Sequence, residues 1–241
     1  MEILKGKIAL ITGASGGIGS CIARRFAQDG ISLALLGRSK EKLAATAASV
    51  REYGVETLLL PGDLLDDAYL EDCFAAVKER FGGLDILVNN AGIALSRSFE
   101  ETTMAEFDRI MALNARVPYL ACHLALPLLR CSECASILNI ASVVAHKGYP
   151  WQSIYAASKH AVLGLSKSLA NEVYTDGVRV HVIAPGGVYT EMVAKVRPDL
   201  DPSVCMLPED IAEAAAFFVE HRTNAVVDEI RLHRANNAPF A

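Results

Sequence analysis

The chain has 241 residues, of which 52% are hydrophobic, and its formal net charge at pH 7 is −5. This length suits one domain of ordinary α/β size with a large core. The negative charge argues against a nucleic-acid partner, because such partners need a basic surface. No apolar run approaches the roughly 18–20 residues of a membrane span. No apolar targeting segment precedes the first strand, so we expect a cytoplasmic protein without membrane contact.

Strand-like and helix-like segments alternate along the chain. Apolar runs predict strands at residues 8–11, 31–36, 55–60, 84–88, 136–141, 178–184 and 225–232. Helical periodicity predicts helices at residues 18–29, 39–53 (capped by Ser39), 67–81, 104–129 (with a candidate kink at Pro118), 152–174 and 208–221. This alternation predicts an α/β fold over residues 1–241: a single doubly wound parallel sheet of about seven strands, with helices on both faces. Ligands of such sheets bind at the carboxyl ends of the strands.

Six cysteines are scattered along the chain: Cys21, Cys73, Cys122, Cys131, Cys134 and Cys205. Without a secretion signal, we expect them to be reduced thiols that mostly serve packing. Cys131 and Cys134 have C-x-x-C spacing, but no second pair completes a zinc site. The sequence therefore predicts a helix-to-strand loop there and no metal centre, with a redox or metal role of this pair as the alternative.

A glycine-rich segment, Thr12-Gly13-Ala14-Ser15-Gly16-Gly17-Ile18-Gly19, joins the first predicted strand to the first predicted helix. Glycines let a backbone turn tightly and approach a pyrophosphate, while a helix N-terminus offers free N–H groups. The G-x-x-x-G-x-G spacing is a variant of the dinucleotide-binding fingerprint, and its place between strand and helix strengthens that interpretation.

The end of the second predicted strand bears on which dinucleotide is bound. An acidic residue here would hydrogen-bond the adenosine ribose, but Gly37 and Arg38 stand instead. The fork of Arg38 suits a 2′-phosphate, and Ser15 and Ser39 could add hydroxyl donors. The sequence thus favours NADP(H), with NAD(H) possible; the alternative is that Arg38 is a solvated surface residue.

The third and fourth predicted strands end in further candidate contacts. Asp63 could receive the adenine amino group, and the run from Asn89 to Gly92 is small enough to let a cofactor pass closely.

Tyr155 and Lys159 stand at i and i+4 of a predicted helix, hence on one face. An ammonium beside a phenol lowers the phenol pKa from about 10, and such a phenol can exchange a proton with a carbonyl or alcohol oxygen. Ser142 could hold the same oxygen.

A Tyr-x-x-x-Lys pair alone is common on amphipathic helices, so the surrounding motifs decide its meaning. Six of them occur in the order and spacing of the short-chain dehydrogenase/reductase family, which the chain resembles over almost its whole length. They are Thr12-Gly13-x-x-x-Gly17-x-Gly19, Asn89-Asn90-Ala91-Gly92, Asn114, Ser142, Tyr155-x-x-x-Lys159 and Pro185-Gly186-x-x-x-Thr190. The resemblance implies a Rossmann fold.

The resemblance also implies a role for each matching residue. Tyr155 would be the acid/base, and Lys159 would bind the nicotinamide ribose and lower the tyrosine pKa. Ser142 would orient the substrate carbonyl, and Asn114 would position a water that links Lys159 to solvent. The implied cofactor contacts are Gly13, Ser15, Gly17, Ile18, Gly19, Arg38, Ser39, Asp63, Leu64, Asn90, Ala91, Gly92, Tyr155, Lys159, Pro185, Gly186, Val188 and Thr190.

The implied activity is hydride transfer between NADP(H) and a carbonyl or secondary alcohol of a small or medium substrate. One alternative is 3-oxoacyl-carrier-protein reduction, with Arg97, Arg109, Arg116 and Arg130 as candidate docking residues. Another is a non-catalytic nucleotide sensor or scaffold. The C-terminus lacks the common Gly-Gly and resembles members that act as hydroxy-acid or general carbonyl reductases.

The substrate pocket is expected to lie beside a short mobile lid at residues 190–207, where Lys195 and Arg197 could meet an acidic substrate group. A homodimer or homotetramer is implied. The expected pocket residues are Ala94, Val143, Val144, His146, Trp151, Tyr189 and Met192, with Tyr149 as a further candidate substrate contact.

Overall fold

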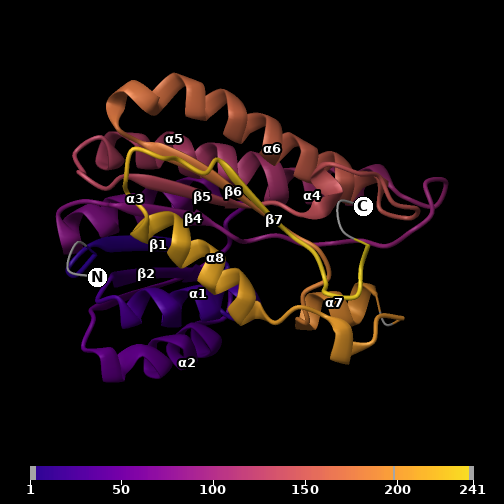
Figure 1. The fold of residues 1–241 in the computed structure, drawn as a ribbon, viewed down its shortest axis with the longest axis horizontal. Coiled ribbons are helices and arrows are strands. Elements are labelled where there is room, and N and C mark those ends of the chain that lie inside the picture. The colour runs from indigo at the N-terminus through magenta and orange to yellow at the C-terminus, as the bar shows by residue number, and fades with distance from the viewer. Residues whose placement is uncertain (1–3, 198, 239–241) are drawn as a thin grey trace.

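The computed structural model describes residues 4–197 and 199–238. The two ends of the expected domain, residues 1–3 and 239–241, lie outside this range. Seven parallel strands form one sheet in the order β3-β2-β1-β4-β5-β6-β7 (Figure 1). Their bounds are β1 Ile8–Thr12, β2 Ser32–Gly37, β3 Thr57–Pro61, β4 Ile86–Asn89, β5 Ser136–Ile140, β6 Arg179–Pro185 and β7 Glu229–Leu232.

Helices cover both faces of this sheet, as the alternation in the sequence predicts. One face carries α1, α2 and α8, and the other carries α3, α5 and α6 (Figure 1). The helix bounds are α1 Gly17–Gln28, α2 Lys40–Val50, α3 Asp67–Phe81, α4 Met104–Met111, α5 Val117–Leu129, α6 Ser153–Val173, α7 Glu191–Val196 and α8 Pro208–Glu220.

Both faces of the central strands are buried, which explains their near-continuous apolar sequence. In β1, Ala9 and Ile11 pack toward α1 and α8, whereas Leu10 packs toward α3 and α5. Alternate residues of a strand point to opposite faces, so a strand between two helical layers needs apolar residues at every position.

Three predicted elements differ from the structure. The last strand begins at Glu229 rather than at residue 225, because the chain bends at residues 223 and 224, where Ala225 N donates to Thr223 Oγ1. The second predicted helix ends at Val50 and continues as a 3₁₀ turn to Tyr53. The predicted helix 104–129 is interrupted by a π-helical turn, Ala112–Arg116, and Pro118 lies in the first turn of α5 beyond it.

The order of the strands indicates where along the sheet edge a ligand would bind. From β1 the chain runs outward to β2 and β3, then crosses to β4 on the other side of β1. At such a switch point the loops that follow two neighbouring strands separate, and ligands bind outside the carboxyl ends there.

No helix among residues 4–197 and 199–238 has both the length and the apolar character needed to cross a bilayer.

Candidate active site

The polar side chains predicted for catalysis meet where β4, β5 and β6 end. Ser142 lies two residues after the end of β5, and its Oγ donates to the carbonyl of Pro185 at the end of β6, 3.2 Å away. Val144 N donates to the same Oγ at 3.4 Å. Tyr155 and Lys159 lie one turn apart on α6, with the ammonium 5.9 Å from the centre of the phenol ring. The local sequence and the strand ends therefore bring these three residues into one cluster.

The expected effect of Lys159 on the Tyr155 pKa is wrong for this structure. Burial raises the pKa of Tyr155 above its ordinary value, and a hydrogen bond with Ser142 offsets part of the rise. Burial also lowers the pKa of Lys159 to about 8. Removal from water disfavours the charged form of both groups, and the recorded hydrogen bond of the ammonium goes to Ile140 O at 2.8 Å rather than to the phenol.

Asn114 lies on the π-helical turn and is 1% exposed. Its amide forms two bonds with the backbone of Ile93: Oδ1 accepts from Ile93 N at 2.9 Å, and Nδ2 donates to Ile93 O at 2.8 Å. Nδ2 also donates to Ser158 Oγ at 3.1 Å. A Cβ placed on Gly92 would lie 3.2 Å from Asn114 Oδ1 and 3.7 Å from Lys159 Nζ. Gly92 therefore packs closely against Asn114, and a side chain at this position would need the Asn114 amide to shift.

The glycine-rich loop is shaped for close backbone approach. A Cβ on Gly13, whose φ is 69°, would lie 2.9 Å from Ala91 Cα, and a Cβ on Gly19 would lie 2.3 Å from Gly13 O. α1 begins at Gly17 without a side-chain cap, so no side chain occupies the N–H groups of its first turn. Such a helix N-terminus attracts an anion. The loop thus fits the pyrophosphate of a dinucleotide, with Ser15 and Ile18 half-buried beside it.

Thr12 joins this loop to the end of β4. Its Oγ1 accepts hydrogen bonds from Asn90 N at 3.0 Å and from Ala91 N at 3.1 Å, and donates to Val88 O. The Asn90 amide donates in turn to Thr12 O and Gly13 O. The sequence motif includes Thr12, but its role as the support of the Asn90 loop was not predicted. Asn90 is engaged with the glycine-rich loop rather than pointing free into the crevice.

Of the two polar side chains that follow β2, Ser39 is already hydrogen-bonded within the described part of the protein and Arg38 is not. Arg38 is exposed, and no hydrogen bond or ion pair of its side chain is recorded in the described residues. Ser39 caps α2 as predicted, since its Oγ accepts from Lys42 N at 3.2 Å, and its hydroxyl also donates to Glu41. Ser15 Oγ would lie 3.0 Å from a Cβ on Gly37. Arg38 is therefore available to a ligand, whereas the Ser39 hydroxyl proton already has a partner.

The remaining cofactor candidates border the same crevice. Asp63 is exposed and its carboxylate accepts from Leu65 N at 3.1 Å, while Leu64 is buried. After β6, Gly186 N donates to Leu232 O at 2.9 Å, and Val188 pairs with Met206. Thr190 caps α7, and its methyl would lie 3.4 Å from a Cβ on Gly17. The structure thus brings the loop after β6 against the glycine-rich loop.

Two expected substrate contacts have other partners. His146 Nε2 lies 2.5 Å from the carboxylate of Glu229, at the start of β7. Arg197 pairs with Asp199 on its own segment at 2.7 Å.

Trp151 is exposed and has a φ of 62°, and its carbonyl accepts from Arg97 N. The segment 190–207 is attached at its base by Tyr189 N to Met206 O and Met206 N to Gly187 O.

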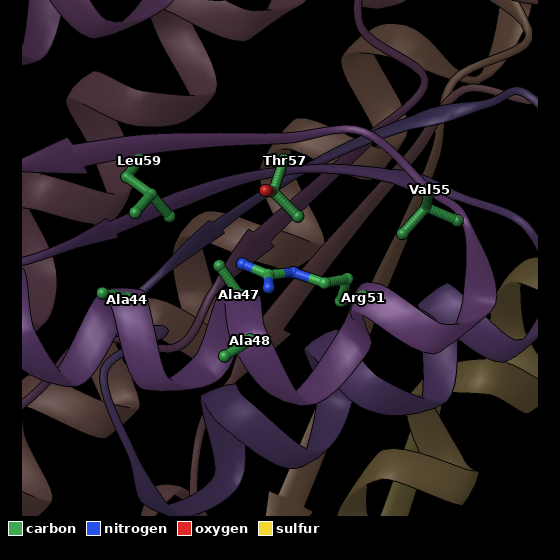
Figure 2. Close-up of a pocket in the computed structure, with 7 residues that line it drawn as sticks. All are labelled: Ala44, Ala47, Ala48, Arg51, Val55, Thr57 and Leu59. Carbon is green, nitrogen blue, oxygen red and sulfur yellow. The ribbon is translucent and has the colours of Figure 1, made fainter.

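Two cavities lie away from these residues. One of about 420 Å³ separates α2 from β3, where the small side chains of Ala44, Ala47 and Ala48 leave space and Arg51 extends along the helix (Figure 2). The other, of about 930 Å³, lies between α6 and the edge formed by β6 and β7. Within the described ranges, no three His, Cys, Asp or Glu side chains gather as metal ligands would.

The sequence model of the short chain dehydrogenase family matches residues 7–201. The chain therefore belongs to this family. It is 37% identical over 217 residues to levodione reductase from Leifsonia aquatica, covering 89% of this chain and 79% of that protein. It is 35% identical over 239 residues to 3alpha-hydroxysteroid dehydrogenase from Mediterraneibacter gnavus, covering 95% of each.

A solved structure agrees with these relatives. An alcohol dehydrogenase from the archaeon Thermococcus sibiricus, complexed with 5-hydroxy-NADP, matches with a TM-score of 0.89 at 31% identity, over 97% of this chain and 98% of that one. The fold prediction, a doubly wound Rossmann-type sheet, is confirmed. The chain is an NAD(P)-dependent oxidoreductase of the kind that acts on alcohol or carbonyl substrates, and this favours an enzyme over a non-catalytic scaffold.

Proposed function

We propose that this protein is an NADP(H)-dependent carbonyl reductase or alcohol dehydrogenase in which Tyr155 is the acid/base. The observation that carries the proposal is the cluster of Ser142, Tyr155, Lys159 and Asn114 at the strand ends, beside a glycine-rich loop that fits a pyrophosphate. When bound, the cofactor supplies or accepts the hydride. The residues described above align the reactants and move the proton.

Tyr155 gives its proton to the substrate oxygen during reduction and takes it back during oxidation. Ser142, which is 7% exposed and interacts with Tyr155, would rotate its hydroxyl proton from the Pro185 carbonyl to the same substrate oxygen. Lys159 has a pKa of about 8, so it can exchange a proton near neutral pH. A Cβ on Gly92 would lie close to both Lys159 Nζ and Asn114 Oδ1, and we propose that Asn114 positions a water on the path from Lys159 to solvent.

The preference for NADP(H) rests on Arg38. Arg38 is exposed and follows Gly37 in the chain, Gly37 packs against the Ser15 side chain, and no acidic side chain follows β2 directly. The similar alcohol dehydrogenase binds an NADP derivative, which supports the same choice. Glu41 argues against a preference for NADP(H), because its carboxylate accepts the hydrogen bond that the nearby Ser39 hydroxyl would otherwise donate to a phosphate.

Calorimetric titration with NADPH and NADH, for the wild type and Arg38→Leu, tests the cofactor proposal. We expect the wild type to bind NADPH more tightly, and the variant to lose about tenfold in NADPH affinity with little change for NADH, because one charge-assisted contact is removed. Equal affinities for both cofactors in the wild type would show that Arg38 does not read a phosphate.

Tyr155→Phe tests the chemistry. We expect turnover to fall by about 10²–10⁴-fold, the usual contribution of acid–base catalysis, while NADPH affinity stays within about twofold. Wild-type turnover in this variant would overturn the assignment of Tyr155.

The substrate class is a small or medium ketone or secondary alcohol. The names of the relatives suggest cyclic ketones, so the panel should include a cyclic diketone and a 3-ketosteroid. Reduction of a carrier-bound 3-oxoacyl group is the second candidate. Three of its four docking arginines are paired with carboxylates, which weakens it: Arg97 with Glu106, Arg116 with Asp67 and Arg130 with Asp176.

We further propose that the chain acts as one unit over residues 1–241, forms a homodimer or homotetramer, and resides in the cytoplasm. Exposed apolar side chains on the α4 and α5 segment support association, with Met104 68% and Tyr119 63% exposed. All six cysteines are free thiols, which suits a reducing compartment.

A further inference from the structure

The turn that carries Ser142 is attached to neighbouring strands through a side chain at each of its ends. Ser142 caps a short 3₁₀ turn, Val143–Ala145, and His146 ends it. At the first end, Ser142 Oγ donates to Pro185 O at the end of β6. At the second end, His146 Nε2 lies 2.5 Å from Oε1 of Glu229, at the start of β7. Two side-chain contacts therefore fix the turn to β6 and β7.

The contact between His146 and Glu229 is well suited to hold the turn. The two side chains are only 25% and 23% exposed, so water competes less for them than for a pair on the open surface. A carboxylate only accepts hydrogen bonds, so Nε2 carries the proton in this contact. A hydrogen bond to a charged acceptor is stronger than one between neutral groups. Glu229 is itself fixed, because it stands beside Val182 in the register of β6 and β7.

The attachment at Ser142 has to change if this residue serves the substrate. A hydroxyl has a single proton to donate, and in the structure that of Ser142 goes to Pro185 O. When it turns to a substrate oxygen, this link to β6 is lost. A backbone bond just before the turn remains, from Ala141 N to Ile183 O at 2.8 Å. Beyond Ser142, the hydrogen bond recorded between the turn and these two strands in the described residues is that of His146.

We propose that Glu229 is a positioning residue: it acts through His146 to hold the turn that carries Ser142 while the Ser142 hydroxyl serves the substrate. This inference rests on the proposed function. In this role Glu229 needs no contact with the substrate. His146 serves as the link between Glu229 and the turn, rather than as the substrate contact expected from the sequence.

Two variants of Glu229 test the role of its carboxylate. Glu229→Ala removes the acceptor for His146, and we expect kcat to fall about tenfold, with NADPH affinity within about twofold, because one hydrogen bond that positions the turn is lost. Glu229→Gln keeps a carbonyl oxygen that accepts from Nε2, so its kcat should stay within about threefold of the wild type. Wild-type kcat in Glu229→Ala, or equal losses in the two variants, would overturn the inference.

Asp228→Ala is the matched control. Asp228 is exposed and directly precedes Glu229, and its backbone carbonyl accepts from Val182 N at 2.9 Å, a bond that alanine retains. This variant therefore removes a carboxylate from the same end of β7 without removing the partner of His146. It should keep the wild-type kcat. A kcat loss as large as that of Glu229→Ala would show that the effect belongs to the strand, and would overturn the inference.

Double-mutant cycles distinguish positioning from a general loss of stability. If Glu229 acts through His146, then Glu229→Ala should cost nothing further in a His146→Ala background. In a Ser142→Ala background it should also leave kcat unchanged, because the hydroxyl that the turn positions is then missing. A merely structural role would lower kcat in the Ser142→Ala background as well. Additive losses in either background would overturn the inference.

The Ser142→Ala variant alone separates the levels of failure. Wild-type kcat in this variant would overturn the role of Ser142 in the proposed function, and this inference with it. A kcat loss in Ser142→Ala beside wild-type kcat in Glu229→Ala would overturn the inference alone. Losses in both variants that do not add in the double variant would support both proposals.

Discussion

Gly92 packs closely against two polar residues of the candidate site. A Cβ at this position would lie 3.2 Å from Asn114 Oδ1 and 3.7 Å from Lys159 Nζ. We predict that Gly92→Ala lowers kcat about tenfold with little change in cofactor affinity, because the added methyl group would crowd Asn114 Oδ1 and displace that amide from its position. Steady-state kinetics and calorimetry measure both quantities.

Gly83→Ala is the control for this prediction, since a Cβ on Gly83 meets no atom within 4 Å. It should keep the wild-type kcat. If Gly92→Ala also keeps it, the close packing of Gly92 on Asn114 has no role in turnover.

The structural role of a single residue was predictable where that role depends on residues nearby in the sequence. Tyr155 and Lys159 share a helix face because they are one turn apart, and Ser39 caps α2 because it directly precedes the helix. The partner of His146 was not predictable, because Glu229 lies 83 residues away. The Tyr155 pKa was mispredicted for a related reason: burial, which depends on the whole fold, exceeds the effect of a neighbour in sequence.

At the level of elements, α1 and α8 are joined by a charged group at their contact. Arg25 pairs with Asp29 at 2.5 Å, with Glu213 at 3.1 Å and with Glu220 at 2.5 Å. The Asp29 side chain is 2% exposed, and burial raises its pKa even though Arg25 opposes the rise. A buried carboxylate that loses its partner is costly, because neither water nor a counter-charge then stabilises it.

We predict that Arg25→Met lowers the free energy of unfolding by about 3 kcal/mol, as measured by denaturant titration. The neighbouring Arg24→Met is the control, because Arg24 forms an exposed 3.4 Å pair with Glu209 and should cost under about 1 kcal/mol. Similar losses in both variants would show that the Arg25 cluster is no more than a surface feature.

The bounds of helices and strands were predictable from the sequence, except where hydrogen bonds to side chains or backbone of other elements set them. Apolar periodicity continues from residue 104 to 129, so it predicts one helix. The π-helical turn at Ala112–Arg116 interrupts that helix where Asn114 bonds Ile93 and Ser158, and neither partner is near in sequence. Single π turns of this kind occur often at functional sites.

At the level of the whole molecule, alternating strands and helices were enough to predict a parallel sheet with both faces covered. The rule that ligands bind at the carboxyl ends of strands then grouped loops from distant parts of the chain. Thr190 and Gly17, 173 positions apart in numbering, do meet in the structure. The contents of the substrate pocket were less predictable, since they depend on side-chain pairs such as His146 with Glu229.

The fold also contains a histidine that should make its stability depend on pH. His181 on β6 is 2% exposed, stacks on Phe218 at 4.4 Å between ring centres, and has one ring nitrogen on Val227 O at 2.8 Å. The other ring nitrogen, Nε2, is buried without a partner. Burial lowers the pKa of His181 from 6.5 to about 4.

Between pH 6.5 and 4 the unfolded chain binds a proton at this ring that the folded chain does not. The contribution of His181 to stability is therefore present above pH 6.5 and is lost as the pH falls. We predict that the free energy of unfolding drops by about 2 kcal/mol from this residue between pH 7 and pH 5. Denaturant titrations of the wild type and His181→Leu should show a smaller drop in the variant, and equal drops would contradict the assignment.

The distribution of thiols has a practical consequence for watching this protein at work. Cys21, Cys73, Cys122 and Cys134 are buried, and burial raises the pKa of each. Cys131 is exposed, and Cys205 is partly exposed in the segment that joins α7 to α8. Because thiolates react and buried thiols stay protonated, a Cys131→Ser variant would direct a maleimide dye to Cys205. Fluorescence from that dye would then report, in real time, how the chain beside Thr190 responds when a cofactor arrives.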